Sequence, residues 1–495
     1  MHKVISTPDV LNEIFLYLSR HTHTIAARVC RLWFTHSIQF IWSTVGVNNI
    51  LAVLSPFDDD GFKQPLLSES WRRFLLYSRH IRTLGCWGIQ YSALRQALLW
   101  SPNVDLFSSK LTVLYWNGRS EYIEYLPPLV TSTLQILKVQ LDIIERPNTL
   151  DVLHQTILLR LPPLHSFELS FPPVGGGTEG VSRSLAGLFS LLSELVFIHL
   201  PCHCMTEKLF TALSRLPQLQ HLSLSYLHSL SPDDNLMKTL PKKKIDDDQK
   251  ARKDIPFCSL GKIDIDLSDS DFMMTEVLQR GIRLLELVDL TYSGHSDHTM
   301  AFMESLHKIC PNLKKITIFA PDGLPFRSLL KCPALVKIVS GGDVDMKFED
   351  SVTIATNRSS WQVITLPSVK PLSFQALVPF AQNCPDLYEL GLTFNSKLGI
   401  PDLHAFTRDD VKFSSLTLLT VGFSEPTSDF GVVLFLSKLF SNPIEIKPSL
   451  FFQERHRLWK TLEKLLNFII STQLEIRTLK DENTLLLAQK CNHDF

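Results

Sequence analysis

The sequence has few of the features that assign a chain to a nucleic-acid-binding or membrane-bound class. Its 49 Lys and Arg residues balance its 50 Asp and Glu residues, which gives a formal net charge of −1. With no excess of basic charge, nucleic acid is not an expected partner. The most apolar stretch, 185–200, is shorter than about 18 residues and contains Glu194 and His199, so no membrane partner is expected. The opening MHKVISTPDV does not have the basic-then-apolar order of a signal peptide, and we expect a cytoplasmic location, a nuclear location or both.

Cysteine is scarce, and its pattern does not predict disulfides or a metal site. The nine Cys residues are an odd number spread thinly along 495 residues, which favours reduced, buried thiols. Cys202, His203 and Cys204 are zinc-ligand types, but no second pair follows at a zinc-like spacing. We therefore expect no bound metal, and we expect His21 and His23 to be surface residues of a linker between helices.

Catalytic motifs are also missing, apart from one glycine pattern. Gly175, Gly177 and Gly180 have the G-x-G-x-x-G spacing of a dinucleotide-binding loop. However, Pro172 and Pro173 separate these glycines from the preceding strand candidate. We expect the loop to be a simple connection, no cofactor and no enzymatic activity. A nucleotide-dependent enzyme that uses Gly175 is the weaker alternative.

What the sequence does contain is a repeated phrase. CPNLKKITI begins at Cys310, CPALVKIVS at Cys332 and CPDLYELGL at Cys384. Each phrase continues as Leu-x-x-apolar-x-apolar, which places two apolar residues on one face of a short strand. Proline ends a helix because it cannot donate the next hydrogen bond, and a buried Cys fits where Leu is too large. The phrase therefore predicts a corner between a helix and the next strand.

The same strand pattern recurs along the chain at intervals of 22 to 41 residues, and most of these intervals lie in or near the leucine-rich-repeat range. Its first apolar positions, the anchors, are Ile81, Leu111, Leu134, Leu164, Leu195, Leu219, Leu260, Leu284, Leu313, Leu335, Trp361, Leu387 and Leu416. Segments with helical apolar spacing, such as 206–217, 298–310 and 373–384, lie between anchors. The match at Leu284 is weak because it turns Asp289 inward.

These observations predict an α/β fold, a leucine-rich-repeat horseshoe solenoid over residues 81–450 with a parallel sheet on its concave face. Segment 231–256 is dense in charge and is expected to be a flexible insertion in one repeat. Residues that alternate with the apolar strand positions are expected to face outward: Ser166, Glu168, Ser223, Asp264, Thr317, Thr393 and Thr420. The candidate substrate-binding residues on the same face are Phe197, His199, His221, Lys262, Lys315, Phe319 and Glu389.

The N-terminal residues 1–45 differ in character and predict a small helical unit, followed by a helical linker or N-terminal cap over 46–80. Ser6 or Thr7 is a candidate helix N-cap, with Pro8 in the first turn. Two sets of apolar residues follow at helical spacing within 11–42. A unit of this size is too small for a large core, so it gains stability by packing against a partner or the neighbouring repeats.

The N-terminal unit resembles the F-box, whose pattern runs Pro-acidic-x-Leu-x-x-Ile-Phe-x-x-Leu and later Val-Cys-x-x-Trp. The matching residues, which the resemblance makes candidates for adaptor binding, are Pro8, Asp9, Leu11, Ile14, Phe15, Leu18, Val29, Cys30 and Trp33. Thr7 and Thr22-His23 depart from the pattern, which has Leu and Asp-Leu there. With WRRFLLYSRHIRTL (71–84) and RHRLWKTLEKLL (455–466), the whole chain resembles the F-box leucine-rich-repeat proteins of mushroom-forming fungi.

This resemblance implies a function. F-box proteins bind the Skp adaptor of a cullin-RING ubiquitin ligase, and their repeat domain captures a protein substrate. The chain is therefore expected to be a non-catalytic, substrate-recognising subunit of an SCF-type ligase. The alternative is a leucine-rich-repeat interaction scaffold that does not engage a ligase.

Residues 451–495 are expected to form a C-terminal helix with one of two roles. Apolar residues recur in steps of four and three from Leu458 to Leu486. Placing Ile469, Ile476 and Asn483 at heptad position a and Leu465, Leu479 and Leu486 at position d resembles a parallel two-stranded coiled coil, in which one buried Asn fixes the register. The favoured interpretation is a cap on the last repeat, and the alternative is a homodimer seam through 458–486.

Overall fold

The computed structural model describes most of the chain. The described residues are 7–100, 106–107, 110–142, 149–172, 178–225, 257, 259–267, 284, 286–294, 297–319, 326–342, 344–368, 370–398, 411–424, 430–448 and 453–493. By its internal contacts the chain divides into two units. Unit 1 contains the described residues up to Asp266, and unit 2 contains Leu267, the last residue of β10, and those from Leu284 onward. Each unit is described separately below.

Unit 1 begins with short helices and continues as alternating strands and helices. Its helices are α1 (Pro8–Leu16), α2 (Arg20–Ala26), α3 (Arg31–Ile41), α4 (Val47–Leu51), α5 (Ser68–Ser78), α6 (Tyr91–Trp100), η2 (Ser120–Tyr125), η3 (Pro127–Leu129), α7 (Thr149–Arg160), α8 (Thr178–Phe189), η4 (Cys202–Cys204) and α9 (Glu207–Ser214). Its strands are β1 (Thr44–Gly46), β2 (Phe57–Asp58), β3 (Gly61–Phe62), β4 (Thr83–Cys86), β5 (Val113–Gly118), β6 (Ile136–Leu141), β7 (Ser166–Ser170), β8 (Phe197–Pro201), β9 (His221–Ser225) and β10 (Lys262–Leu267).

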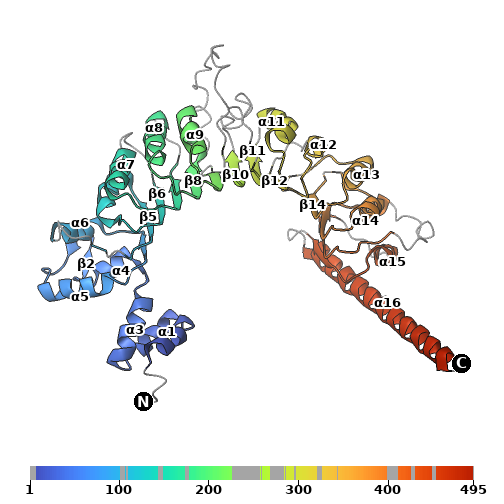
Figure 1. The fold of residues 1–495 in the computed structure, drawn as a ribbon, viewed down its shortest axis with the longest axis horizontal. Helices are drawn as coiled ribbons and strands as arrows, with labels where there is room; N and C mark the ends of the chain where they lie inside the picture. Colours follow the sequence, from blue (N-terminus) through green and yellow to red (C-terminus); the bar gives the residue numbers. More distant parts are fainter. Residues whose placement is uncertain are drawn as a thin grey trace, which may run out of the picture. The chain divides into compact units, whose positions relative to one another are not determined.

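The sheet of unit 1 is parallel and follows chain order, β1 to β4 and on to β10. Its register aligns one apolar residue from each strand: Leu84, Leu114, Leu137, Phe167, Ile198, Leu222 and Ile263. Each of these side chains is buried, and burial of one contributes about 1.5–3 kcal/mol. Helices α7, α8 and α9 stack side by side on this face of the strands (Figure 1). Every repeat therefore shares its core with its neighbours.

Unit 2 repeats the same construction. Its strands are β11 (Asp289–Gly294), β12 (Lys315–Phe319), β13 (Lys337–Ser340), β14 (Val363–Leu366), β15 (Glu389–Leu392), β16 (Leu418–Gly422) and β17 (Glu445–Pro448), paired in parallel in that order. Its helices are α11 (Asp297–Ile309), α12 (Phe326–Leu329), α13 (Phe348–Asn357), η7 (Phe374–Leu377), α14 (Val378–Asn383), η8 (Ser396–Leu398), α15 (Phe430–Leu439) and α16 (Gln453–His493). The expected leucine-rich-repeat solenoid with a parallel sheet is thereby confirmed.

The Cys-Pro phrases lie at helix-to-strand corners, as predicted. Cys310, Cys332 and Cys384 are buried, and each lies just before a turn that leads into the next strand. Arg358 ties one corner to the following repeat, because its guanidinium donates to the carbonyl oxygens of Leu335 and, at 2.6 Å, of Cys332. The same guanidinium lies 5.2 Å above the Trp361 ring. These contacts explain why a corner without Leu as its anchor still forms a regular repeat.

The structure corrects the strand pattern at one repeat and extends it at both ends. Leu287, not Leu284, precedes β11, because Leu290 pairs in register with Ile316 and Asp289 pairs with Lys315. Asp289 consequently faces outward instead of inward. The anchors also miss the first strand, β1, and the last, β17, where Trp42 and Pro443 stand at the anchor positions. The charged insertion 231–256 lies outside the described residues.

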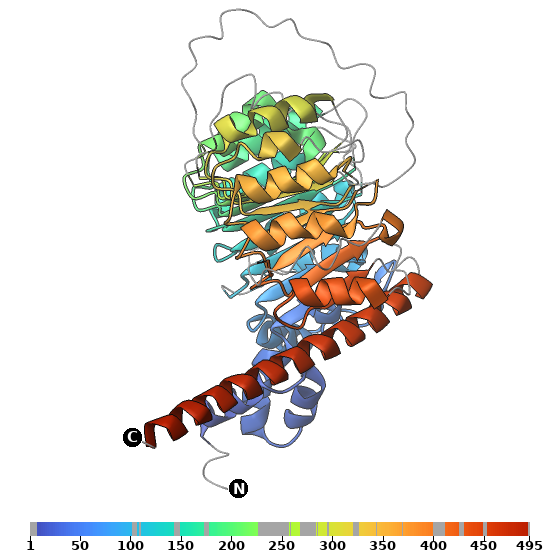
Figure 2. The ribbon, with the colours of Figure 1, turned by 90° about the vertical axis from the view of Figure 1, so that its right-hand side faces the viewer.

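The last element of unit 2, α16, is a single helix of 41 residues. Its first half packs on α15 and β17, and its second half extends beyond the last repeat (Figure 2). Trp459, Leu466 and Ile470 are the buried apolar residues of its first half. The favoured interpretation of a capping helix is in keeping with these contacts.

Candidate functional site

The N-terminal helices α1, α2 and α3 form a small unit around an aromatic centre. Leu11, Phe15 and Ala26 are buried in it, with Leu18, Leu32, Trp33 and Phe40 packed against them. Phe15 meets the Trp33 ring edge-on, with centroids 5.6 Å apart. Such T-shaped pairs add about 0.5–1.5 kcal/mol beyond area burial. The helical period therefore places Leu11, Phe15 and Trp33, which match the F-box pattern, in or against this core.

His23 belongs to this core as well, which corrects the sequence-based expectation of a surface histidine. Its side chain is 4% exposed, stacks on Phe40 at 4.9 Å and meets Phe15 at 5.7 Å. Burial lowers the pKa of His23 below its ordinary value, and this outweighs the contact with the Leu18 backbone, which raises it. His23 acts here as an aromatic core residue.

The nine residues that match the F-box pattern thus divide into two groups. Leu11, Phe15, Leu18 and Trp33 hold the helices together, and Cys30 is the half-buried N-cap of α3. Pro8, Asp9, Ile14 and Val29 are exposed. The unit also exposes further large apolar side chains, namely Leu16, Tyr17, Ile25 and Phe34. The second group is available to contact another protein, whereas Leu16, two residues from Ile14, lies on the opposite side of α1.

The second candidate surface is the face of the sheet opposite the repeat helices, which we call the open face. In unit 1 the register aligns two outward rows along it. The first row contains Thr83, Val113, Ile136, Ser166, Phe197, His221 and Lys262. The second row contains Gly85, Tyr115, Lys138, Glu168, His199, Ser223 and Asp264. The predicted residues Phe197, His199, His221 and Lys262 therefore lie on three adjacent strands.

Hydrogen bonds and an ion pair join these predicted residues. Asp264 Oδ2 lies 2.7 Å from His221 Nε2 and 2.8 Å from Lys262 Nζ, so one carboxylate holds two partners. The Phe197 ring meets His221 edge-on at 4.7 Å. His199 bonds Ser223 at 2.9 Å and Ser225 at 3.0 Å through its two ring nitrogens. This group is a rigid, polar and aromatic surface of the kind that contacts proteins.

Burial favours the neutral form of His199, one member of this group. It lowers the pKa of His199 below its ordinary value, and the nearby Glu168 carboxylate acts in the opposite direction. Because its two ring nitrogens are both engaged by hydroxyl groups, the ring is held in one orientation. His199 therefore presents a fixed, uncharged ring at neutral pH.

The sequence analysis missed the neighbouring aromatic part of the open face. The Lys138 ammonium lies 5.4 Å from the Tyr115 ring centroid and 2.8 Å from Glu168. Trp87 is 55% exposed and lies over Gly85, where an added Cβ would come within 2.1 Å of the ring. The outward strand positions can be found in the sequence by counting two and four residues on from each early anchor. Nothing in the sequence, however, shows that the Trp87 side chain folds back over Gly85.

In unit 2 the predicted residues are spread along the open face. Lys315 and Phe319 lie on β12, whereas Glu389 lies on β15. Lys315 Nζ lies 2.7 Å from Asp289 Oδ2, and Phe319, 48% exposed, covers Gly341. One expected outward residue is wrong: Thr393 is buried, and its hydroxyl accepts a hydrogen bond from the Ser368 amide at 3.1 Å.

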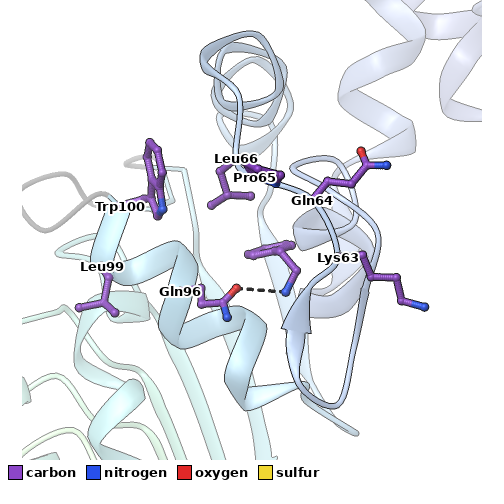
Figure 3. Close-up of a pocket in the computed structure, with 8 residues that line it drawn as sticks. Lys63, Gln64, Pro65, Leu66, Gln96, Leu99 and Trp100 are labelled. Carbon is purple, nitrogen blue, oxygen red and sulfur yellow. Dashed lines mark hydrogen bonds between the residues drawn. The ribbon is translucent and has the colours of Figure 1, made fainter.

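A shallow cleft of about 400 Å³ lies between β3, the following segment 63–66 and the C-terminal end of α6 (Figure 3). It is lined by Phe62, Lys63, Gln64, Pro65, Leu66, Gln96, Leu99 and Trp100. The Phe62 amide donates to Gln96 Oε1 at 3.0 Å and fixes one wall, while Leu99 and Trp100 are exposed. The cleft is apolar, with neither a charge cluster nor a catalytic arrangement among these residues.

Within the described part of the chain, no group of three His, Cys, Asp or Glu side chains is placed to hold a metal ion, and no helix is long and apolar enough to cross a bilayer. Cys202 and Cys204 are buried in η4, and burial lowers the pKa of His203 to about 4. Gly175 and Gly177 lie outside the described residues, while Gly180 lies in α8.

Comparison with known proteins finds similarity only at the level of solved structures. The chain matches no protein-family model and no curated protein. An internalin (InlF) from Listeria monocytogenes is 14% identical over 66% of this chain and 77% of its own, with a TM-score of 0.33. TLR13, in a TLR13–ssRNA13 complex, is 12% identical over 78% of this chain and 62% of its own, with a TM-score of 0.30. At these values neither similarity carries an argument.

Proposed function

We propose that this chain is the substrate-binding subunit of an SCF-type cullin-RING ubiquitin ligase. In this proposal the N-terminal unit binds the Skp adaptor and the open face binds a protein substrate. The observation that carries it is the F-box pattern over residues 8–33, combined with the division of those residues into a buried core and an exposed group. The chain itself performs no chemistry and instead raises the effective concentration of its substrate near the ubiquitin-conjugating enzyme.

The exposed group is suited to binding the adaptor. Ile14 is 43% exposed and Val29 is 55% exposed, although both are large and apolar. Burying one such side chain against a partner contributes about 1.5–3 kcal/mol. Leu11 and Phe15 act indirectly, because they hold α1 at the angle that presents Ile14.

The open face is suited to binding a protein. It places aromatic rings beside charged groups that are already paired, such as Phe197 and His221 beside Asp264. Rigid aromatic side chains lose little conformational entropy on binding and often dominate interface energetics. We expect the substrate contact to centre on β8, β9 and β10, and on Trp87 and Tyr115.

The second candidate function is a leucine-rich-repeat scaffold without a ligase. It shares the open face and differs only in the N-terminal unit, where Thr7 and Thr22-His23 depart from the F-box pattern. Binding of the intact chain to the Skp adaptor therefore separates the two candidates.

The test is co-purification of the full chain with a Skp adaptor. The intact chain is expected to retain the adaptor, and Ile14→Asp is expected to lose it by about tenfold or more in affinity, because a carboxylate replaces a buried apolar contact. Leu16→Asp is the matched control, since Leu16 is 62% exposed on the same helix but two residues away, on the opposite side of α1. Failure of the intact chain to bind would reject the ligase assignment and leave the scaffold.

A further inference from the structure

Helix α16 uses two different faces, and only one of them is occupied by the repeats. Trp459, Leu466 and Ile470 are buried against unit 2, and Glu463 and Asn467 hydrogen-bond its backbone. With about 100° of rotation per residue, these five residues form one stripe, which we call the cap face. By the same helical geometry, the heptad residues lie on a second face of α16, about 140° around the helix axis from the cap face.

The second face, which we call the seam face, is mostly apolar, and its residues are exposed except Leu462, Ile469 and Thr472, which are half-buried. Its heptad positions are Leu458, Leu462, Leu465, Ile469, Thr472, Ile476, Leu479 and Asn483. Leu458 is 47% exposed, Ile476 48% and Leu479 59%. The seam face therefore continues the heptad pattern beyond the cap, where Ile476, Leu479 and Asn483 are exposed.

The described side chains in the outer half of α16 have no packing to stabilise the helix. Every side chain from 473 to 485 is exposed, a stretch of more than three turns. Isolated helices of about 12–15 residues are marginal in water, and helical stability in proteins comes mainly from packing of an apolar face. An exposed seam face on such a helix calls for a partner.

We propose that this partner is a second copy of the chain, joined through residues 458–486 as a parallel, in-register two-stranded coiled coil. The seam face is self-complementary in this arrangement. Ile476 at a and Leu479 at d are the residue types that favour two parallel strands, and Asn483 at a pairs with its counterpart and fixes the register. The cap face stays in place, because it uses other side chains of the same helix.

The flanking charges agree with a parallel pair. Glu475 takes position g, and Lys480 takes position e of the next heptad. In a parallel dimer these two positions approach each other across the seam, so Glu475 of one copy meets Lys480 of the other and the reverse. A heptad that faced an unrelated partner would not need opposite charges at these two positions.

The cap face of α16 therefore stabilises the fold, and the seam face joins two copies of the chain. Two copies joined in this way carry two open faces and two N-terminal units. When the partner is repeated or multivalent, binding of one open face raises the effective concentration of the second open face. Two weak contacts then bind more tightly together than either does alone.

The test is sedimentation of the full chain, whose single-chain mass is 56.4 kDa. We expect twice this mass, with dissociation on dilution. Leu479→Asp is expected to weaken association by roughly 100-fold or more, because each copy loses one apolar seam contact and adds a charge. Leu485→Asp is the matched control: Leu485 is also exposed, at 63% against 59%, but lies at position c. A single-chain mass for the intact protein at high concentration would overturn the proposal, and so would equal effects of the two variants.

A charge exchange tests the parallel register separately. Glu475→Lys alone places like charges across the seam and is expected to weaken association by roughly fivefold. Adding Lys480→Glu in the same chain recreates both pairs and is expected to restore the wild-type dissociation constant. Failure of the double variant to recover while Leu479→Asp still dissociates the dimer would overturn the parallel arrangement.

Discussion

Asn467 and Ile444 exchange two hydrogen bonds. The Ile444 amide donates to Asn467 Oδ1, and Asn467 Nδ2 donates to the Ile444 carbonyl, both at 2.9 Å. Glu463 accepts the Ile446 amide at 2.7 Å in the same way, while the Glu445 amide between them bonds back to Thr417. Side chains of α16 thus satisfy the outer edge of the last strand, which would otherwise be open to pairing with another chain.

Asn467→Leu is therefore expected to destabilise unit 2 by about 1–3 kcal/mol, since it leaves both polar groups of Ile444 unpaired. Urea unfolding measures the loss, and hydrogen exchange at the Ile444 amide should quicken first. Gln473→Leu makes a similar substitution at an exposed position of the same helix and should change stability by less than about 0.5 kcal/mol. Equal stability of the two variants would show that the Asn467 bonds contribute nothing.

Arg358 is expected to be the most important charged side chain for stability in unit 2. Arg358→Ala removes the bonds to Cys332 and Leu335 and the contact with Trp361, and should cost about 2–4 kcal/mol. Arg183→Ala, which removes a surface ion pair with Glu179, should cost less than about 0.5 kcal/mol. Chemical unfolding of the two variants measures the difference. A cost for Arg358→Ala as small as that of the control would contradict the corner role.

Much of this architecture could be predicted from the sequence, because each repeat contains the apolar pattern of its own strand. The anchors from Leu111 to Leu260 and from Leu313 to Leu416 fall where the strands require them. The error at Leu284 arose because Leu284 and Leu287 each have a Leu three residues later, and only the pairing of Leu290 with Ile316 selects the second. The terminal strands β1 and β17 escaped notice because Trp42 and Pro443 stand where the pattern has its anchor, although Val45 and Ile446 are buried in the aligned row.

Side-chain placement was less predictable than strand position. His23 looked like a surface residue because the sequence does not show that Phe40, 17 residues later, stacks on it. Thr393 alternates correctly with its strand but is buried because the Ser368 backbone reaches it from the preceding repeat. Both cases depend on contacts between elements, which periodicity along one element does not contain. The adaptor-binding and substrate-binding assignments stay predictions.

His203 should make the stability of unit 1 depend on pH. Neither of its ring nitrogens has a hydrogen-bond partner among the described residues, and burial lowers its pKa to about 4. The unfolded chain, with an ordinary pKa of about 6.5, takes up the proton first as pH falls. The free energy of unfolding should therefore decline from pH 6.5 down to about 4 by up to about 3 kcal/mol, and should not change above pH 7.5.

His203→Phe keeps the edge contact with Phe171, whose ring lies 5.0 Å away, and removes the titrating group. Its unfolding free energy should match that of the wild type at pH 7.5 and exceed it near pH 4.5. Urea unfolding at a series of pH values measures both curves. Parallel curves for the two proteins across this range would contradict the assignment.

The Cys thiols at the helix-to-strand corners should be alkylated more slowly the higher their pKa. Burial raises the pKa of Cys332 to about 11, with Arg358 opposing it, and raises that of Cys384 to about 12. At pH 8 the reactive thiolate is then about 100-fold scarcer at Cys332 and about 1,000-fold scarcer at Cys384 than for an ordinary thiol. Iodoacetamide labelling followed by mass spectrometry should show Cys30, which is half-buried, labelled well before either. Labelling of Cys384 at the rate seen in urea would contradict this order.

Phe15→Ala should unfold the N-terminal unit and spare the repeats. Phe15 is fully buried and meets His23, Trp33 and Phe40 edge-on, so its loss costs about 3–5 kcal/mol in a unit with few other buried residues. Limited proteolysis should then cut within 7–42 while the repeats stay intact. Adaptor binding, if present in the wild type, should be lost together with protease resistance, whereas Ile14→Asp should lose binding and keep resistance. A Phe15→Ala chain that remains as resistant as the wild type would show that the aromatic centre does not hold α1, α2 and α3 together.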